Sequence, residues 1–386
     1  MISLAGALCY AELASTYPTQ GGEYHYMTRA FGTGPGFLFV WARLTVIQTG
    51  SIAMLAFLIG DYLAETFSQL PLASPHYAAL TVLLVTAVNL IGIRQGKQVQ
   101  WSLIIVLLFG LGTLIVTGSL LRPAAPQPFL AEALPGKAMI FVLLTFGGWN
   151  EAAYLSAEVR GSARNMLRVL VGSIALVTLL YLAVNLALLR GLGQAGMSGS
   201  DAVAADLMRL AVGEGGARLV SLLVVTASLS TMNATMITGA RSGYALGRDF
   251  PRLGFLGRWQ AQRRTPVNAL LAQGGIALLL VAAGSWARNG FEAMVAYTAP
   301  VFWFFFFLVG LSLFVLRRKE PSVHRPFRVP LYPLLPLFFC AVCLAMLMAS
   351  LAFTGVGALV GGAVLLTGIP LLLLVRPSPT RKENPR

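Results

Sequence analysis

A glycine pair followed by two polar residues lies in the middle of an apolar segment, residues 138–159. Each glycine weakens a helix by about 1 kcal/mol relative to alanine, and an Asn-Glu pair at membrane depth is costly unless it faces protein or water. We therefore predict a discontinuous helix, whose free backbone groups and half-helix dipoles bind an ammonium or a carboxylate group. The alternative is close helix packing through small residues, with the polar pair near the cytoplasmic end of the span. The candidate substrate-binding residues are Phe146, Gly147, Gly148, Trp149, Asn150 and Glu151.

A second group of polar residues lies in the apolar segment 216–240. In a functional interpretation, hydroxyl and amide groups at this density line a path or coordinate a cation. In a structural interpretation, they hydrogen-bond between helices. The sequence leaves both interpretations open. The candidates for a path or an ion site are Ser228, Ser230, Thr231 and Asn233.

Two further charges lie inside apolar segments. For Glu12 we expect a structural partner rather than a role in proton relay. For Arg43, near the inner end of its span, we expect a long side chain that carries its guanidinium group to the membrane boundary.

The sequence predicts no metal site, no cofactor and no enzyme. The three histidines, His25, His76 and His324, are far apart in the chain. Cys340 and Cys343 form a C-x-x-C pair inside an apolar segment, but no second pair of ligands accompanies them, and a closed zinc site needs four ligands. We also recognise no pairing of a nucleophile with a base.

Composition indicates an integral membrane protein. Hydrophobic residues make up 57% of the chain and charged residues only 11%, whereas a soluble domain has about 25% charged residues. The net charge of +14 comes from short basic clusters between apolar segments. A nucleic-acid-binding protein gathers its basic residues on one soluble face, so we expect the lipid bilayer, and no nucleic acid, as the partner.

The apolar segments predict an all-α fold with about eleven membrane segments. A helix of about 20 residues crosses a hydrocarbon core of roughly 30 Å. The first apolar segment, 2–15, has about 14 residues and reaches only about 21 Å, so it is a partial span. The ten full-length candidates are 36–64, 76–93, 100–121, 138–159, 167–190, 216–240, 266–285, 291–316, 331–353 and 355–375.

Basic residues predict the orientation of these spans. If alternate loops from residues 16–35 onward face the cytoplasm, those loops and the C-terminal tail hold 21 of the 28 lysines and arginines. Because cytoplasmic loops are rich in basic residues, the C-terminus is expected in the cytoplasm and Met1 outside.

Four stretches, taken together and in this order, make the chain resemble the amino acid–polyamine–organocation (APC) superfamily, and most of all its L-type amino acid transporter-like permeases. The resemblance covers residues 2 to about 336. The stretches are 7–24, 146–160, 233–249 and 325–333, which include Ala7-Leu8-Cys9-Tyr10-Ala11-Glu12, Phe146-Gly147-Gly148-Trp149-Asn150-Glu151 and Arg325-Pro326-Phe327-Arg328.

The resemblance implies a LeuT-like fold of two inverted five-helix repeats plus two further helices. The predicted segments would then be the family's helices two to twelve, and its first helix would be missing. A single membrane domain, 1–386, would comprise an incomplete first repeat (1–121), a second repeat (138–316), two additional helices (331–375) and a cytoplasmic tail (376–386). Many relatives carry a lysine in the helix that matches 100–121, and at the matching position this chain has Leu107. The sequence therefore does not indicate which ion, if any, is coupled to transport.

Two functions compete. The first is a secondary active transporter that moves amino acids across the plasma membrane by alternating access, as a uniporter, an antiporter or a symporter. The second is an N-terminally truncated, non-transporting remnant, or a subunit that depends on a partner. Neutral amino acids are the default substrate, because most of the expected site consists of apolar side chains and backbone. Glu151 also allows a cationic substrate or an amine as an alternative. The sequence does not indicate an accessory subunit.

Overall fold

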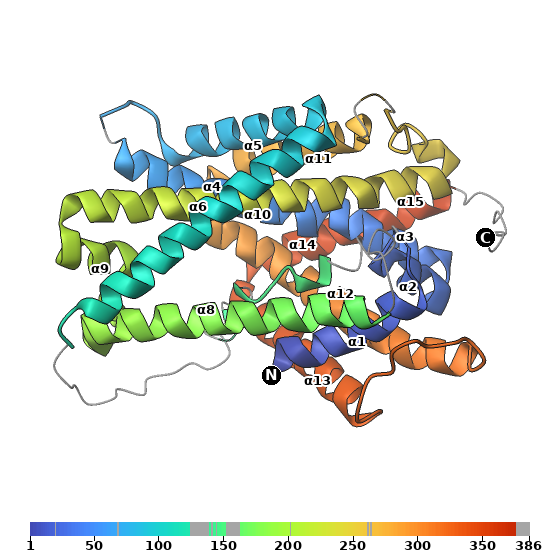
Figure 1. Cartoon of the computed structure of the whole chain (residues 1–386). Coiled ribbons are helices and arrows are strands. Elements are labelled where there is room, and N and C mark those ends of the chain that lie inside the picture. The colour runs from blue at the N-terminus through green and yellow to red at the C-terminus, as the bar shows by residue number, and fades with distance from the viewer. Residues whose placement is uncertain are drawn as a thin grey trace.

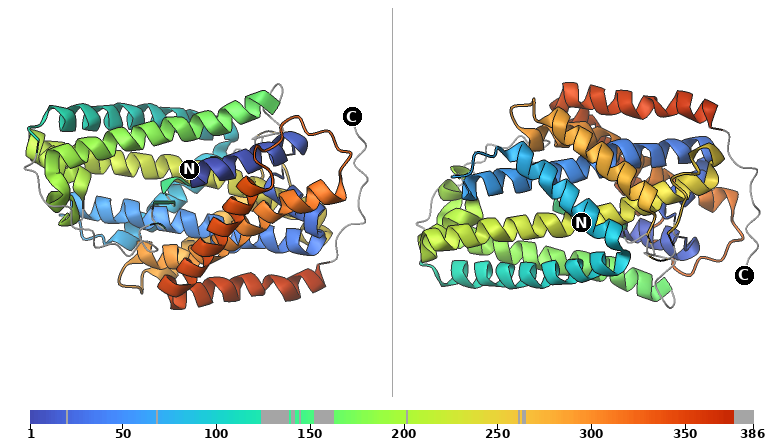
Figure 2. Two further views of the ribbon diagram at one scale, coloured as in Figure 1. Left: turned by 90° about the horizontal axis from the view of Figure 1, so that it is seen from below. Right: turned by 90° about the horizontal axis from the view of Figure 1, so that it is seen from above.

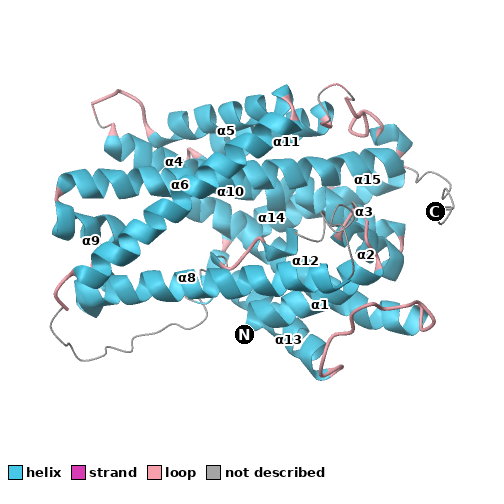
Figure 3. Cartoon of the chain, in the orientation of Figure 1, coloured by secondary structure: helices cyan, strands magenta, loops and turns pink. Residues whose placement is uncertain are grey.

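The computed structural model describes residues 1–19, 21–67, 69–123, 139, 142–143, 145–151, 163–200, 202–260, 262 and 265–375. Within these ranges the chain forms helices and no β-strand (Figure 3). One isolated β-bridge joins Gln260 and Thr265. The described part of the chain confirms the predicted all-α fold.

The described helices follow one another along the chain, and Figure 1 shows how they are arranged. The first part of the chain forms α1 (Ile2–Thr16), α2 (Glu23–Phe31), α3 (Thr33–Ala42), the π-helical turn η1 (Arg43–Ile47), α4 (Gln48–Thr66), α5 (Ser74–Ile91) and α6 (Ile93–Leu120). The second part forms α8 (Ala163–Ser198), α9 (Val203–Val212), α10 (Glu214–Asp249), the short 3-10 turn η3 (Pro251–Leu253), α11 (Val267–Gly284), α12 (Gly290–Lys319), α13 (Leu334–Thr354), α14 (Val356–Leu366) and α15 (Gly368–Leu374).

Nine helical stretches in the described part are long and apolar enough to cross a membrane. They correspond to nine of the ten predicted full-length spans. The tenth, 138–159, lies largely outside the described residues. As predicted, the first apolar segment is short, since α1 has 15 residues and so a length of only about 22 Å. The nine stretches are Thr33–Thr66, Ser74–Ile91, Gln98–Leu120, Leu167–Ser198, Glu214–Asp249, Val267–Gly284, Gly290–Lys319, Leu334–Thr354 and Val356–Leu374.

One boundary differs clearly from the prediction. The span predicted at 216–240 continues as α10 to Asp249, so the first nine residues of the predicted loop 241–265 are helical. A prediction based on apolar length stops where the apolar residues stop. The continuation contains alanine, leucine and arginine, which favour a helix whether or not it lies in lipid.

Two spans form the centre of the molecule, and others form its edge (Figure 2). In the most apolar windows, 78% of the residues are buried in the span formed by α3, η1 and α4, and 61% in α12. The corresponding shares are 17% for α6 and 11% for α8. Apolar side chains that are exposed on a membrane span contact lipid, so α6 and α8 have large lipid-facing surfaces.

Candidate functional site

The backbone around the glycine pair is not a continuous helix. Thr145 is helical, residues 146–148 form a turn, and residues 149–151 form one 3-10 turn in which Glu151 N donates to Gly148 O at 3.1 Å. Gly148 has a φ of +93°, a conformation that strains any residue with a Cβ. A Cβ at Gly148 would meet no heavy atom within 4 Å. The glycine is therefore required by backbone conformation rather than by lack of space, and the predicted interruption is present.

Trp149 packs inward from the break. Its ring lies edge-on to Tyr10 of α1 and to Phe306 of α12, with centroid distances of 5.0 and 5.8 Å. A Cβ at Gly6 of α1 would lie only 2.6 Å from Trp149 Cη2. Because Gly6 has no side chain, the indole can lie directly against α1 and hold this side of the break in place.

Phe146 fixes the other side of the break to α8. Its ring lies edge-on to Tyr181, with a centroid distance of 5.1 Å. The Tyr181 hydroxyl donates to the backbone oxygen of Thr145 at 2.7 Å. The two aromatic residues thus anchor the break to different helices, while Gly147 and Gly148 between them are exposed.

A buried arginine lies beside the break. Arg43, in the π-helical turn η1, is 2% exposed. It donates to Glu151 through two hydrogen bonds of 3.2 and 3.0 Å, to Glu23 at 3.0 Å and to Ser242 Oγ at 3.1 Å. The expectation that Arg43 extends to the membrane boundary is wrong. A buried charge is costly unless it is paired, and two carboxylates face this guanidinium.

Neutral donors complete the binding of the two carboxylates. Glu23 accepts hydrogen bonds from Tyr10 at 2.5 Å and from Asn150 at 3.3 Å. Glu151 also accepts one from Gln48 at 3.0 Å. Asn150 is 4% exposed, and the Glu151 side chain is 25% exposed. Both polar residues of the motif therefore bind partners inside the protein.

The structure brings all six candidate substrate-binding residues to the break and adds partners that the sequence analysis missed. These partners are Tyr10, Glu23, Arg43, Gln48 and Ser242. A signal for Arg43 was present, since a charge inside a span indicates a functional site with a partner. A π-helical turn such as η1 is also frequent at functional sites, but it is visible only in the structure.

The candidates on α10 divide into two kinds. Asn233 accepts from Asn89 of α5 at 2.8 Å and donates to Gln100 of α6 at 3.0 Å, and Gln100 donates to Ser230 at 2.8 Å. Ser230 and Asn233 thus join three helices. Thr231, by contrast, donates within α10, to Ala227 O at 3.1 Å.

Ser228 is buried on the same helix. These four residues do not touch the break through any described hydrogen bond. About 13.5 Å of helix separates Asn233 from Ser242, the α10 residue that binds Arg43.

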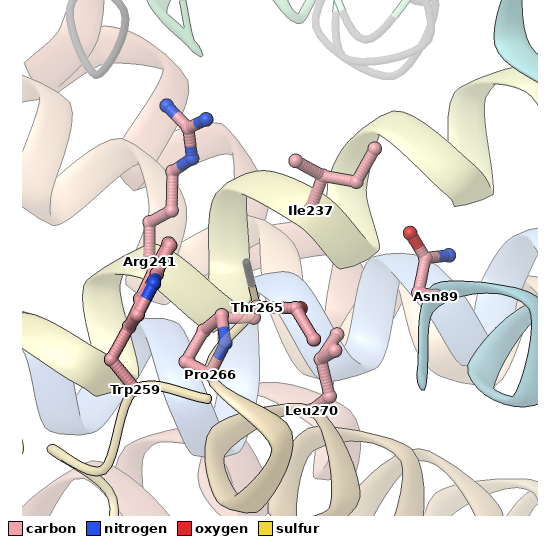
Figure 4. Close-up of a pocket in the computed structure, with 8 residues that line it drawn as sticks. Asn89, Ile237, Arg241, Trp259, Thr265, Pro266 and Leu270 are labelled. Atoms are coloured by element: carbon pink, nitrogen blue, oxygen red, sulfur yellow. The ribbon is translucent and has the colours of Figure 1, made fainter. Parts of the chain in front are cut away.

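Asn89 also lines a small pocket between α5, α10 and α11, which the sequence analysis did not predict (Figure 4). The pocket lies at the end of α10 that carries Arg241, and Trp259 borders it on the side away from Asn89. Its lining residues are Asn89, Ile237, Ala240, Arg241, Trp259, Thr265, Pro266 and Leu270.

Glu12 has the structural partners that were expected. It is 2% exposed and accepts two hydrogen bonds from Arg317 of α12, at 2.8 and 2.5 Å. It also accepts one from Val329 N at 2.6 Å, and Arg325 lies 3.6 Å away. Glu12 therefore ties α1 to the end of α12 and to the segment that follows it.

The comparisons agree with this architecture. The sequence profile described as amino acid permease matches residues 1–374. The mouse b(0,+)-type amino acid transporter 1 is 27% identical over 364 residues, which are 91% of this chain and 73% of that protein. The mouse large neutral amino acids transporter small subunit 2 is 28% identical over 396 residues (97% and 72%). The human cystine/glutamate transporter is 25% identical over 387 residues (97% and 76%).

Proposed function

This chain belongs to the amino acid permease family, and on that basis we propose that the helix break at residues 146–148 binds the amino acid that the protein carries. The protein is a multi-pass membrane transporter and not an enzyme. The observation that carries the proposal is the exposed glycine pair in non-helical backbone, held between two anchored aromatic residues. Interrupted membrane helices offer backbone N–H and C=O groups to charged ends of a substrate.

The contacts of Glu151 support a neutral amino acid as the substrate. Arg43 binds both of its carboxylate oxygens and Gln48 binds one of them. A cationic side chain would have to compete with this pairing, so Glu151 serves chiefly to fix the turn after Gly148. The relatives' names differ in the substrates they give, and amino acid transport is what they share.

We infer the cellular arrangement from the charge distribution. The basic loops and the C-terminus face the cytoplasm, and the protein lies in the plasma (inner) membrane, because positive residues concentrate on the cytoplasmic side. Residues 1–121 belong to the first repeat, 138–316 to the second, and 331–375 to two additional helices. Substrate is exposed to each side in turn as the repeats move around the break.

A matched pair of glycine variants tests the site. Gly148 and Gly213 have φ values of +93° and +80°, and a Cβ at either position would meet no heavy atom within 4 Å. Gly148→Leu and Gly213→Leu therefore introduce the same kind of backbone strain, but Gly213 lies between α9 and α10, away from the break. Binding of labelled amino acids to the purified protein should be abolished in Gly148→Leu and retained in Gly213→Leu. Equal binding by both variants would refute the proposed site.

A further inference from the structure

The segment that follows α10 is held firmly against the helices. Phe250 and Leu256 are 1% and 2% exposed. The Phe250 ring lies edge-on to Phe37 of α3, with a centroid distance of 4.9 Å. Asn268 of α11 donates to the backbone oxygen of Phe255 at 2.7 Å. The segment is thus anchored to α3 and α11.

A pair of glycines brings this segment into backbone contact with α10. A Cβ at Gly247 would lie 2.1 Å from Gly257 N, and a Cβ at Gly257 would lie 2.7 Å from Gly247 C. No side chain fits between these two positions, so the segment 250–260 lies directly on the end of α10. The side chains that it carries outward therefore have a fixed place on the surface.

The outward side chains are basic and aromatic. Phe255 and Trp259 are 50% and 44% exposed although both are large and apolar. Arg248, Arg252 and Arg258 are exposed beside them. We call these five residues the basic–aromatic surface.

Ring contacts organise this surface. Trp259 lies edge-on to Tyr244 of α10, with a centroid distance of 5.2 Å. The guanidinium carbon of Arg248 lies 5.9 Å from the centre of the same tyrosine ring. Tyr244 thus connects an arginine of α10 with the exposed tryptophan of the following segment.

The basic–aromatic surface lies where membrane spans end. It connects α10 with α11, and both are candidate membrane spans. Arg252 also donates to the backbone oxygen of Leu374, the last residue of α15. In Figure 1 the segment lies at the same end of the molecule as the end of α15. Three spans therefore end at this surface, which places it at the boundary between lipid and water.

We propose that the basic–aromatic surface binds the headgroups of anionic phospholipids. Guanidinium groups donate two parallel hydrogen bonds to phosphate oxygens. Tryptophan is favoured at the level of the headgroups, and clustered arginines next to a membrane span attract anionic lipids. Asp249, the acidic residue next to Arg248, accepts a hydrogen bond from the Tyr24 hydroxyl at 2.5 Å. This inference does not depend on the proposed substrate site.

Lipid retention by the purified full-length protein tests the inference. The protein is titrated in detergent with phosphatidylglycerol or phosphatidylcholine, and the bound lipids are counted by native mass spectrometry. The variant replaces Arg248, Arg252 and Arg258 with glutamine. The control is Arg288→Gln. Arg288 is also exposed and is close in sequence to Trp286, which is 89% exposed. It follows the opposite end of α11.

The wild-type protein and Arg288→Gln should retain phosphatidylglycerol in preference to phosphatidylcholine. The triple variant should lose about fivefold in affinity per arginine, since each basic residue near an anionic leaflet contributes about 1 kcal/mol. In the wild-type protein, retention of phosphatidylglycerol should fall as salt is added. Equal retention of the two lipids by the wild-type protein, or unchanged retention by a folded triple variant, would overturn the inference. Full displacement by an acidic soluble peptide of equal charge would also overturn it.

Discussion

The guanidinium group of Arg43 holds both carboxylate oxygens of Glu151, although 108 positions separate the two residues in the chain. This pair connects η1, in the middle of the most buried span, with the turn that follows the helix break. Arg43 also binds Glu23 of α2 and Ser242 of α10. One side chain therefore fixes the break relative to two other helices, and the first prediction concerns its removal.

Replacing Arg43 with glutamine should destabilise the protein by about 3–5 kcal/mol, because removing one partner of a buried ion pair leaves an uncompensated charge. Adding Glu151→Gln should recover part of this loss, because one of the two carboxylates that lost the Arg43 partner is then replaced by a neutral amide. Denaturant unfolding in detergent, followed by tryptophan fluorescence, measures each free energy of unfolding. A coupling energy near zero between the two substitutions would show that the pair does not contribute as the contacts indicate.

Asn233 on α10 should be a stabilising residue. Its two hydrogen bonds to α5 and α6 contribute about 0.6 kcal/mol each if they resemble other hydrogen bonds between membrane helices. Asn233→Ala should therefore lower the free energy of unfolding by about 1 kcal/mol, without changing how uptake depends on sodium. Thr231→Ala is the control, because the described hydrogen bond of the Thr231 hydroxyl stays within α10. Loss of a sodium dependence in Asn233→Ala, with unchanged stability, would favour an ion site instead.

The ion pair between Arg29 and Glu320 should make stability depend on pH. Burial raises the pKa of Glu320, but hydrogen bonds from Arg29 and Tyr17 and the nearby positive charges outweigh it, so the pKa lies below the ordinary value of 4.5. A carboxylate with a lowered pKa stabilises the folded state above its unfolded pKa, and this contribution is lost as the pH falls through the folded pKa.

Glu320→Gln should therefore lower the melting temperature at pH 7, and the difference from the wild-type protein should shrink below pH 4.5. The exposed Glu65 supplies the control substitution, Glu65→Gln. A difference that stays constant between pH 7 and pH 3.5 would show that packing, rather than ionisation, explains the effect.

The proposed orientation is tested at two exposed serines. Ser198 ends α8 and Ser322 follows α12. The charge distribution places Ser198 outside and Ser322 in the cytoplasm. In intact cells, a membrane-impermeant thiol reagent should label a cysteine at position 198 and not one at 322, on a background without native cysteines. The reverse pattern would invert the topology.

Apolar length was enough to predict most of the fold. Nine spans match in the described residues, because a helix that crosses the hydrocarbon core needs about 20 mainly apolar residues. The break was predictable for a similar local reason, since Gly147 and Gly148 together disfavour a helix. The end of α10 was missed because the helix continues through Arg241–Asp249, past the last long run of apolar residues, where apolar length gives no information.

The partners of the motif were not predictable from local sequence. Pairing of Arg43 with Glu151, or of Tyr10 with Glu23, depends on how distant helices pack. From the sequence alone, an arginine near the end of a span has a simple alternative, which is to reach the membrane boundary. The structure excludes this alternative because Arg43 is 2% exposed and two carboxylates lie within hydrogen-bonding distance of its guanidinium group.

Substrate protection of a cysteine introduced at position 147 tests the central claim most directly. Gly147 is exposed and is not among the glycines with positive φ, so Gly147→Cys introduces a thiol at the break without the strain expected at Gly148. The native Cys9, Cys340 and Cys343 are replaced by alanine beforehand. Ser198→Cys, at the exposed end of α8, is the control.

The rate of modification by a small thiol reagent is measured in each variant with and without a saturating mixture of amino acids. A substrate bound at the break should slow the reaction of the thiol in Gly147→Cys and leave that of the thiol in Ser198→Cys unchanged. An unchanged rate in Gly147→Cys, in a protein that still binds amino acids, would contradict the assignment of the substrate site to this break.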